Sequence, residues 1–600
     1  MILEGKNTES SRQALIFSVL ICLVCLAPLA FLLFDLWRYP YLISGGLAMR
    51  IVAAGLLTKG ESPYVDFWDW SQPIVFELLH GLTALCNFLS SVGIAVIPAS
   101  FIPMCIFAAL VASVILIAML ATQALAAQAL VTEAPASQVP ASQAPATSAI
   151  DSERRNIQEF ALAISFAMVL TALIARFDFG ELQYVLVFAI APWFFLRWLN
   201  HGQMMESKIS PPSEISPVSK VSPVSTVPKV SRTLAALVGL AAGCAACFDI
   251  PYLCVFIILE LTLLLQSLRW RSLVSIEWLT FILALAANAL YLMTLSEPVH
   301  TAFWQWTMPL KWLNYSIIDP AIVAPLSTPH RLDIIYCMVA AALAAFLLGK
   351  KHNVFAPLVA LMLSGLGLFM LEGQGFSHDF TLTIFALVAI GCCLAFFALR
   401  VSRAPTILFI ASTLVVTAVV CTSLELDRSK LQDHVSANIS QGNLPLNLAL
   451  EKTSKVNDSV TILSPYIEPT YPLLLFSGRK PGGYLLWSRP LWLFKWISDN
   501  STFTGPMKDF HNHTWSNIES EIAQHRTDLF VAADDKVLNT FDHERFFHAL
   551  RKGYLEVDTT GDYFSLGNHQ PHEYCGSNPQ FRIFVKREIS TPGRGMNARP

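Results

Sequence analysis

The stretch ALIFSVLICLVCLAPLAFLLF, residues Ala14–Phe34, contains no charged side chain and decides the class of fold. A helix needs about 20 apolar residues to cross the hydrocarbon core of a bilayer, and this run is long enough. It has no small-residue cleavage site of the kind found in signal peptides, it contains Pro28, and it ends at Asp35. We therefore expect an uncleaved first membrane span.

Apolar runs of similar length recur along the chain. Of its 600 residues, 54% are hydrophobic and 14% are charged, whereas soluble domains carry roughly 25% charged residues. Further candidate spans start near Pro73, Phe101, Ile157, Leu182, Leu234, Pro251, Leu273, Ile334, Phe355, Phe380 and Pro405. The sequence thus predicts a mainly α fold, a polytopic transmembrane bundle of about 11–13 helices.

Charge and cysteine content exclude two classes of protein. The net charge of −3 provides no basic surface for nucleic acid. Most of the 12 cysteines lie inside apolar runs, where a thiol behaves as a small hydrophobic group. The spacing of the cysteines therefore indicates no disulfide framework.

The distribution of polar residues predicts two domains. Residues 1–424 form the transmembrane domain, and residues 425–600 form a water-soluble one. Low-complexity repeats such as APASQ and ISPVSK predict flexible linkers at 129–155 and 200–232. The loops 37–72 and 296–332 mix aromatic and charged side chains and are expected to be ordered.

The soluble domain shows an alternation of helices and strands. Leu446–Ser454 reads as a helix before the β-branched strand Ser459–Leu463. Ile518–His525 reads as a second helix before the strand Leu529–Ala532. This alternation predicts a small α/β unit.

Sidedness follows from the distribution of basic residues and the number of spans. Lys6 and Arg12 favour an inside N-terminus, which places the loop 37–72 outside. Seven candidate spans separate this loop from 296–332, so the two loops share a face only if one candidate does not cross. The stretches on either side of Phe177–Gly180 and of Phe248–Pro251 are short and broken by Asp or Pro. We expect the candidate that does not cross to be one of these.

Candidate functional residues are most concentrated in the stretch RIVAAGLLTKGESPYVDFWDWSQP, residues Arg50–Pro73. Acidic groups are inexpensive at a membrane surface and expensive in lipid. Asp66 and Asp69 can therefore be ordinary interfacial residues beside the anchors Trp68 and Trp70. Alternatively, they carry the chemistry of a site.

This text resembles the first exoplasmic loop of the GT-C glycosyltransferase superfamily, in the branch of bacterial protein-mannosyltransferases and aminoarabinose transferases. The shared features are an apolar stretch, Gly60, Pro63-Tyr64, an Asp-Phe-x-Asp and a Pro that opens the next span. Three further fragments resemble the family in order: FDFGELQ (Phe177–Gln183), Gly239–Pro251 and GQGFSHDF (Gly373–Phe380). In the second of these, Asp249 stands where a Lys is usual.

The resemblance implies inverting transfer of a sugar from a polyprenyl-phosphate carrier to a saccharide, lipid or protein acceptor of the cell envelope. The site would lie at the outer face of a bacterial inner or plasma membrane, with the C-terminal domain exoplasmic. A carboxylate must take the acceptor's proton, while Lys, Arg or a divalent metal holds the leaving phosphate. Asp66 is the favoured base, with Asp69 and Asp35 as alternatives. The residues expected to bind phosphate or the lipid carrier are Arg50, Lys59, Lys311 and His378.

One departure from the family pattern keeps other functions open. The family's base usually precedes the matching Gly by fourteen or fifteen positions, which here falls on Gly45 or Gly46. Either another acid substitutes, or the chain is a non-catalytic relative. A third reading is a transporter or flippase of lipid-linked saccharides, although no inverted repeat is visible in the sequence.

Overall fold

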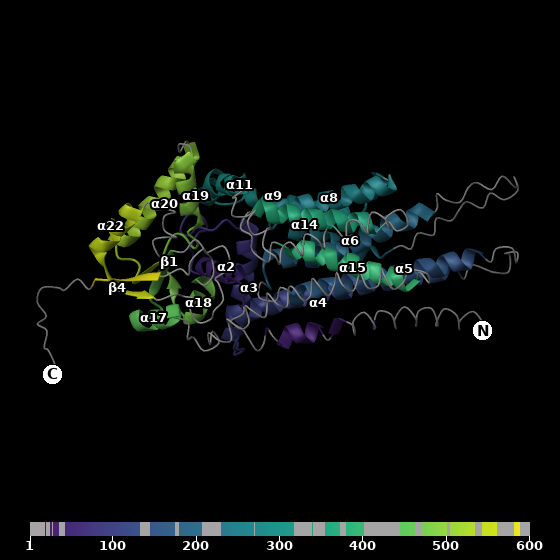
Figure 1. The fold of residues 1–600 in the computed structure, drawn as a ribbon, viewed down its shortest axis with the longest axis horizontal. Helices are drawn as coiled ribbons and strands as arrows, with labels where there is room; N and C mark the ends of the chain where they lie inside the picture. Colours follow the sequence, from purple (N-terminus) through teal and green to yellow (C-terminus); the bar gives the residue numbers. More distant parts are fainter. Residues whose placement is uncertain are drawn as a thin grey trace, which may run out of the picture.

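A computed structural model of the protein describes most of the bundle and of the C-terminal domain (Figure 1). The described residues are 19, 25, 26, 28–34, 36, 43–132, 145–174, 179–206, 230–268, 270–316, 339, 354–372, 380–400, 445–463, 470–500, 505–533, 543–560 and 581–587.

The described chain is mostly helical. Six of its helices are long and apolar enough to cross a membrane: α3 (Pro73–Ser91), α4 (Pro98–Thr132), α5 (Pro145–Ile174), α6 (Leu182–Glu206), α8 (Ile250–Ser267) and α9 (Ile276–Met293). Further apolar helices are α2 (Gly45–Leu57), α7 (Arg232–Ala246), α14 (Phe355–Glu372) and α15 (Thr381–Arg400). A helix satisfies its own backbone hydrogen bonds, which is why lipid accepts it. The mainly helical fold with several apolar helices of membrane-spanning length is confirmed, and the described residues hold six such helices, against the 11–13 spans expected for the whole chain.

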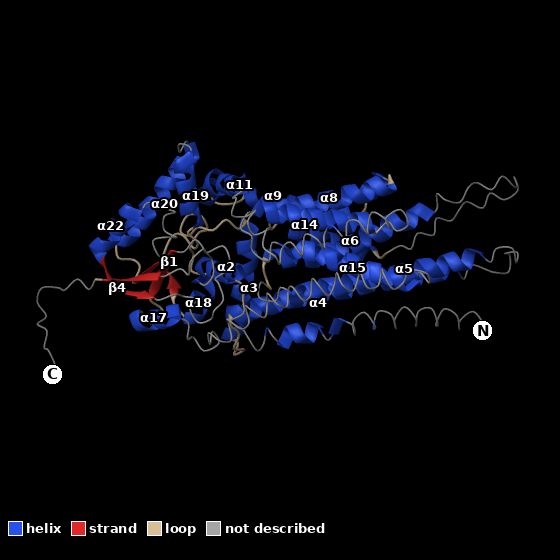
Figure 2. Cartoon of the chain, in the orientation of Figure 1, coloured by secondary structure: helices blue, strands red, loops and turns tan. Residues whose placement is uncertain are grey.

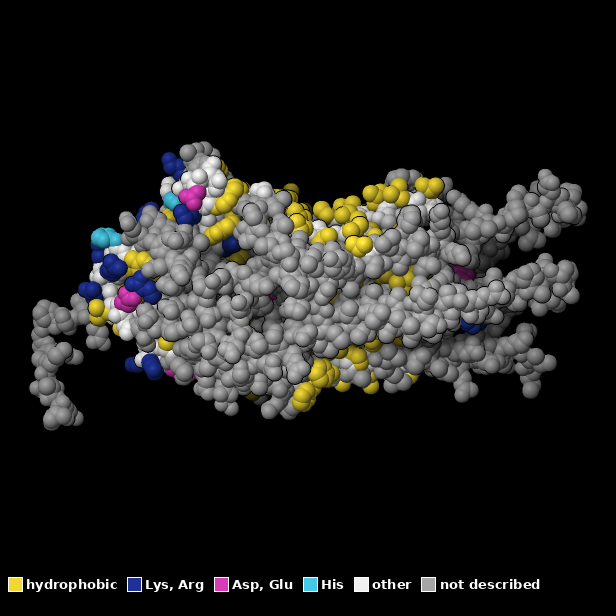
Figure 3. Space-filling model, viewed as in Figure 1, with side chains coloured by type: hydrophobic (Ala, Val, Ile, Leu, Met, Phe, Trp, Pro, Cys, Tyr) yellow, Lys and Arg dark blue, Asp and Glu magenta, His cyan; other side chains and the backbone are white. Residues whose placement is uncertain are grey.

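The outside of the bundle is apolar (Figure 3). On α9, for example, Leu279, Leu283 and Leu290 are each more than 60% exposed, at 62%, 61% and 64%. Contiguous apolar surface of this kind is unfavourable in water and neutral in lipid. This exposed apolar surface, together with the length of the helices, is typical of a membrane protein.

Small residues allow α7 and α9 to pack closely. Gly239 and Gly243 lie one turn apart on α7, and a β-carbon at Gly239 would lie 2.7 Å from the carbonyl carbon of Glu277. At Gly243 it would lie 2.7 Å from the carbonyl oxygen of Phe281. The Gly-x-x-x-Gly spacing permits close backbone approach without any need for polar contacts.

One helix between the first loop and α6 does not cross the bundle. Glu181, just before α6, contacts Gly46 of α2, so both ends of the segment α3–α5 lie at the same end of the bundle. Three helices connect these ends, and an odd number cannot all cross. Figure 1 shows α4 and α5 running along the long axis, whereas α3 lies near α2. Of these three helices, α3 is thus the one that does not run along the bundle, although it is long and apolar enough to cross a membrane.

The C-terminal domain is built on a mixed five-stranded sheet (Figure 2). The strand order is β2-β1-β3-β5-β4, for β1 (Ser459–Leu463), β2 (Lys480–Pro481), β3 (Leu529–Ala533), β4 (Tyr554–Thr560) and β5 (Phe581–Lys586). Strand β1 pairs in parallel with β2 and β3, and β5 pairs antiparallel with β3 and β4. The helices are α17 (Pro445–Thr453), α18 (Thr470–Ser477), α19 (Arg489–Asn500), α20 (Gly505–Ala523) and α22 (His543–Gly553). Both predicted helix–strand pairs are present.

The predicted linkers are shorter than expected. Helix α4 continues to Thr132 and α5 begins at Pro145, so much of 129–155 is helical. Likewise, α6 continues to Glu206 and α7 begins at Arg232, which leaves 207–229 outside the described residues. The helices extend beyond the apolar stretches of the sequence because Ala, Gln and Glu are good helix formers.

Candidate functional site

The first loop, the segment after α9 and the C-terminal domain meet at one end of the bundle (Figure 1). The main-chain NH of Trp68 donates to the carbonyl oxygen of Tyr484 at 2.7 Å, and the NH of Leu486 donates back to the carbonyl of Trp68 at 3.2 Å. The indole Nε1 of Trp68 donates to Oγ1 of Thr307 at 3.2 Å. Thr307 closes a π-helical turn, Phe303–Thr307 (η5), a rare element that is frequent at functional sites.

A second contact joins the soluble domain to the segment after α9. That segment consists of α10 (Glu297–Ala302), η5 and α11 (Met308–Ser316). Arg489, at the start of α19, donates from Nη2 to Oδ1 of Asn314 at 3.1 Å. All three polar segments are therefore in direct contact.

The first loop is held by its own turns. Ser44 caps α2, because its Oγ accepts from the NH of Leu47 at 3.1 Å. At 13 residues, α2 is too short to span a bilayer. Past its end the chain reverses at Gly60, whose φ of +88° suits glycine. The hydroxyl of Tyr64 then donates to the carbonyl of Ser71, which closes the loop.

Arg50, on α2, is the centre of a buried polar cluster. Its Nη1 donates to Oε2 of Glu181 at 2.7 Å and its Nε donates to Oγ of Ser71 at 3.2 Å. Its Nη2 donates to none of the residues that the structure describes. Burial lowers the pKa of Arg50, but the charges of Glu181 and then Asp69 raise it by more, so the pKa lies above its ordinary value.

Asp69 is a buried carboxylate without a hydrogen-bond donor. Its exposed fraction is 0%, and within the described part of the chain neither carboxylate oxygen accepts a hydrogen bond. Its charge acts on Arg50, and it contributes, after burial, to the raised pKa of Tyr471 on α18. An unpaired buried carboxylate costs several kcal/mol, on the order of 3–5 kcal/mol. Retaining one is typical of a group whose partner is a ligand.

Asp66 and Lys59 lie outside this cluster, on exposed parts of the loop. Oδ2 of Asp66 accepts from the main-chain NH of Ser62 at 2.7 Å. The NH of Asp66 also donates to the carbonyl of Ser62 at 2.9 Å. The carboxylate of Asp66 thus closes its own turn.

Lys311, on α11, already has an anionic partner. Its Nζ donates to Oδ2 of Asp249 at 2.7 Å, and both side chains are nearly buried, at 9% and 12% exposed. The hydroxyl of Tyr315 also donates weakly to this carboxylate, at 3.4 Å. The ammonium that was expected to bind phosphate is therefore neutralised by the acid that precedes α8.

Two of the expected site residues, Asp35 and His378, lie outside the described residues. The sequence, in turn, did not assign Glu181 to the site. It stood out only as an acid between two short apolar runs, where a turn outside the bilayer explained it equally well. The one available signal was its place immediately before a long apolar helix, because an acid there can point back into the polar end of a bundle.

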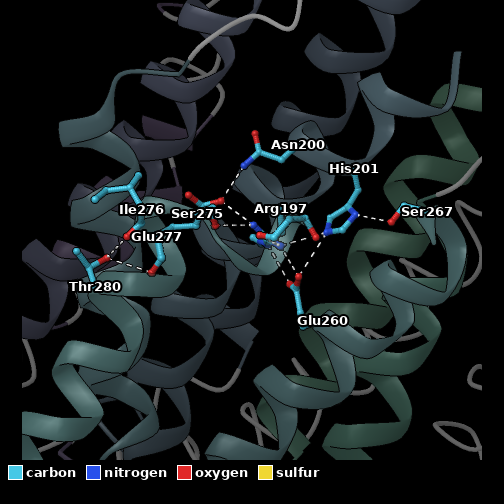
Figure 4. Close-up of polar contacts among 10 residues, drawn as sticks. Arg197, Asn200, His201, Glu260, Ser267, Ser275, Ile276, Glu277 and Thr280 are labelled. Atoms are coloured by element: carbon cyan, nitrogen blue, oxygen red, sulfur yellow. Dashed lines mark hydrogen bonds and ion pairs between the residues drawn. The ribbon is translucent and has the colours of Figure 1, made fainter. Parts of the chain in front are cut away.

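A second buried ionic cluster lies at the other end of the bundle (Figure 4). Arg197 of α6 donates to Glu260 of α8 and, at 2.6 Å, to Oε1 of Glu277 of α9. Its remaining donors reach His201, the hydroxyl of Ser275 and the carbonyl of Ser272. Because every guanidinium nitrogen has a partner, this cluster joins three helices and leaves no group free for a ligand.

No group of three or more His, Cys, Asp or Glu side chains among the described residues could hold a metal ion. Comparison with known proteins returns no matching protein-family model and no matching curated protein. The geometry of the cluster around Arg50 and Asp69 is therefore the basis for assigning a function.

Proposed function

We propose that the protein is a membrane glycosyltransferase. It moves a sugar from a polyprenyl-phosphate donor to a cell-envelope acceptor at the outer face of the membrane, as the resemblance to the GT-C superfamily implies. One observation carries the proposal: the unpartnered buried carboxylate of Asp69 lies near a guanidinium, that of Arg50, which still has an unused nitrogen among the described residues.

These two groups match the two charges that develop during glycosyl transfer. The acceptor oxygen attacks the anomeric carbon, and its proton passes to the carboxylate of Asp69, which acts as general base. The bond from the anomeric carbon to the phosphate oxygen breaks, and the polyprenyl phosphate leaves with that electron pair. Arg50 stabilises the negative charge of the leaving phosphate through its free Nη2.

Asp69 suits the role of base better than the favoured candidate from the sequence, Asp66. The carboxylate of Asp66 is exposed and accepts a hydrogen bond from its own turn. Asp69 is buried and accepts no hydrogen bond from the described residues, and electrostatic interactions are stronger where water is excluded. We therefore assign the proton transfer to Asp69 and a structural role in the turn to Asp66.

The C-terminal domain contributes by covering the loop that carries Asp69. The segment Tyr484–Leu486 pairs with Trp68, and α18 packs against α2. In this role the domain binds or shapes the acceptor and keeps water away from the sugar. A transporter has no evident use for such a cover.

Purified protein, supplied with a radiolabelled polyprenyl-phosphate sugar and a cell-envelope extract, tests the proposal. We expect label to pass to the acceptor. We expect Asp69→Asn to lower the rate by about 10² to 10⁴-fold, the range for a lost general base, without lowering the protein level. Asp66→Asn is the matched control, because it removes the neighbouring carboxylate from the same loop, and it should keep most of the activity.

Other outcomes identify the competing functions. Movement of the lipid-linked sugar across a vesicle membrane without covalent transfer would indicate a flippase. The absence of both activities across several lipid-linked sugars would indicate a non-catalytic relative. Equal activity of the wild type and Asp69→Asn would remove Asp69 from the role of base.

A further inference from the structure

The carboxylate of Glu181 occupies the space directly beside Gly46. A β-carbon at residue 46 would overlap Oε1 of Glu181 and would lie 2.7 Å from Oε2 and 2.9 Å from Cδ, inside the 3.0 Å that real β-carbons essentially never cross. Gly46 is helical, so its backbone conformation does not require glycine. The missing side chain at residue 46 serves to admit a carboxylate that arrives from the start of α6.

Glu181 is held in that place by charge. Its side chain is 3% exposed and its Oε2 accepts from Nη1 of Arg50 at 2.7 Å. Gly46 is the second residue of α2, and the N-terminal turn of a helix attracts negative charge. A guanidinium and a helix terminus together therefore fix a carboxylate that the fold has removed from water.

The spacing along α2 shows where a carboxylate on the same helix could also reach Arg50. Residues 46 and 50 are four apart on one helix, the separation at which an acid and a base on the same face form an ion pair. This chain has glycine at the first of these positions and supplies the carboxylate from another helix. The ion pair of Arg50 is thus made across space instead of within α2.

We infer that Glu181 is the positioning residue of Arg50. With Nη1 on Glu181 and Nε on Ser71, two sides of the guanidinium are fixed, and Nη2 is left for the leaving phosphate. The inference rests on the proposed function for the role of Arg50, but the pairing of Glu181 with Gly46 is independent of it. Misplacement of such a group by about 1 Å can cost on the order of 10²-fold in rate.

Exchanging the two side chains tests the inference. We expect Glu181→Ala to lower turnover by about 10²-fold, because Arg50 loses its partner. Gly46→Asp alone should be equally damaging, since the new side chain overlaps Glu181 and adds a like charge. The double variant Gly46→Asp/Glu181→Ala restores an acid four residues before Arg50, and it should recover turnover to within about 10-fold of the wild type.

Glu277→Ala provides the matched control, because it also removes a buried acid from an arginine, at the far end of the bundle. It should lower the Tm in detergent but leave turnover per folded molecule unchanged. A double variant that recovers Tm without turnover would overturn the positioning role, because Glu181 would then only join α2 to α6. A double variant that recovers neither quantity would overturn the pairing as well.

Failure of the proposed function gives a different pattern. If the wild type transfers no sugar, the turnover of the variants cannot be compared with it. The assignment of Arg50 to the leaving phosphate is then withdrawn. The Tm values still decide whether Glu181 and Gly46 form a pair, because each single variant should then melt below the double variant.

Discussion

At the scale of residues, Glu521 shows what burial does to an acid without a cationic partner. It lies on α20, where Oε1 accepts from Oγ1 of Thr461 at 2.6 Å and also from the hydroxyl of Thr527. The main-chain NH of Tyr484 donates to it too, and Arg526 is the nearest charge that acts on it. Burial outweighs these interactions and raises the pKa of Glu521 to about 7.

This pKa predicts that the protein loses stability as pH rises. The folded state binds the proton with a pKa of about 7, while the unfolded state has the ordinary value of 4.5. The contribution of Glu521 to stability is therefore fully present below pH 4.5 and is lost as pH rises to about 7, by roughly 3 kcal/mol in total. Thermal unfolding of the purified protein between pH 5 and 8 measures this loss.

Glu521→Gln should flatten this pH dependence, because the amide keeps the hydrogen-bond acceptor and cannot ionise. Glu519→Gln is the control on the same helix, since Glu519 is 40% exposed and paired with Arg545. A slope that is the same in wild type and Glu521→Gln would show that another group causes it.

The sequence predicted only part of the candidate site, because a sequence motif shows which residues are neighbours along the chain and not which distant residues contact them. Arg50 and Asp69 were found, since both lie inside one polar stretch. Glu181 contacts Arg50 from 131 positions away along the chain. The same is true of Lys311. The sequence suggested an ammonium available to phosphate, but its ion-pair partner Asp249 lies 62 positions earlier in the chain.

At the scale of elements, helix identity followed from the period and length of apolar runs. The pairs α17–β1 and α20–β3 were recognised because β-branched residues and short apolar runs favour strands. The orientation of α3 was not predicted, because a 19-residue helix with a mean hydropathy of 1.4 is long and apolar enough to cross a membrane whether or not the surrounding helices allow it. Only contacts such as that of Glu181 with Gly46 decide this.

Helix packing gives a prediction at α7. Gly239→Ala should destabilise the protein by about 1–3 kcal/mol, the range for overpacking, because its methyl group would overlap the backbone of Glu277. Gly81→Ala in α3 is the control, since nothing lies within 4 Å of its β-carbon position. It should leave stability unchanged or raise it slightly through helix propensity. Thermal melting in detergent compares the two, and equal Tm values would contradict close packing of α7 on α9.

At the scale of the whole molecule, the two ends of the bundle differ in chemistry. One end carries the first loop, the C-terminal domain and the incompletely paired cluster around Arg50. The other end carries the satisfied cluster around Arg197 (Figure 4). Under the proposed function this asymmetry is expected, because, of these two clusters in the described part of the chain, the cluster around Arg50 is the one that keeps unpaired polar atoms.

Single-cysteine labelling tests which end faces outward. With a cytoplasmic N-terminus, Thr58→Cys in the first loop and Val456→Cys in the soluble domain should both react with an impermeant maleimide on spheroplasts. Val274→Cys, which is 91% exposed between α8 and α9 at the other end, should react only after permeabilisation. The unsubstituted protein controls for its native cysteines. If Val456→Cys needed permeabilisation while Thr58→Cys did not, a site shared by the loop and the domain would be excluded.

The Arg197 cluster also constrains the order in which the cell can build this protein. Arg197 lies within the candidate span Leu182–His201, and an arginine opposes insertion by up to about 2.5–3.5 kcal/mol at a span's centre. Its acidic partners Glu260 and Glu277 follow 63 and 80 residues later. At about 5–20 residues per second, α6 waits roughly 4–16 s for the second of them. We therefore expect α6 to reach its full stability in the membrane only after α8 and α9 have been made and paired with it.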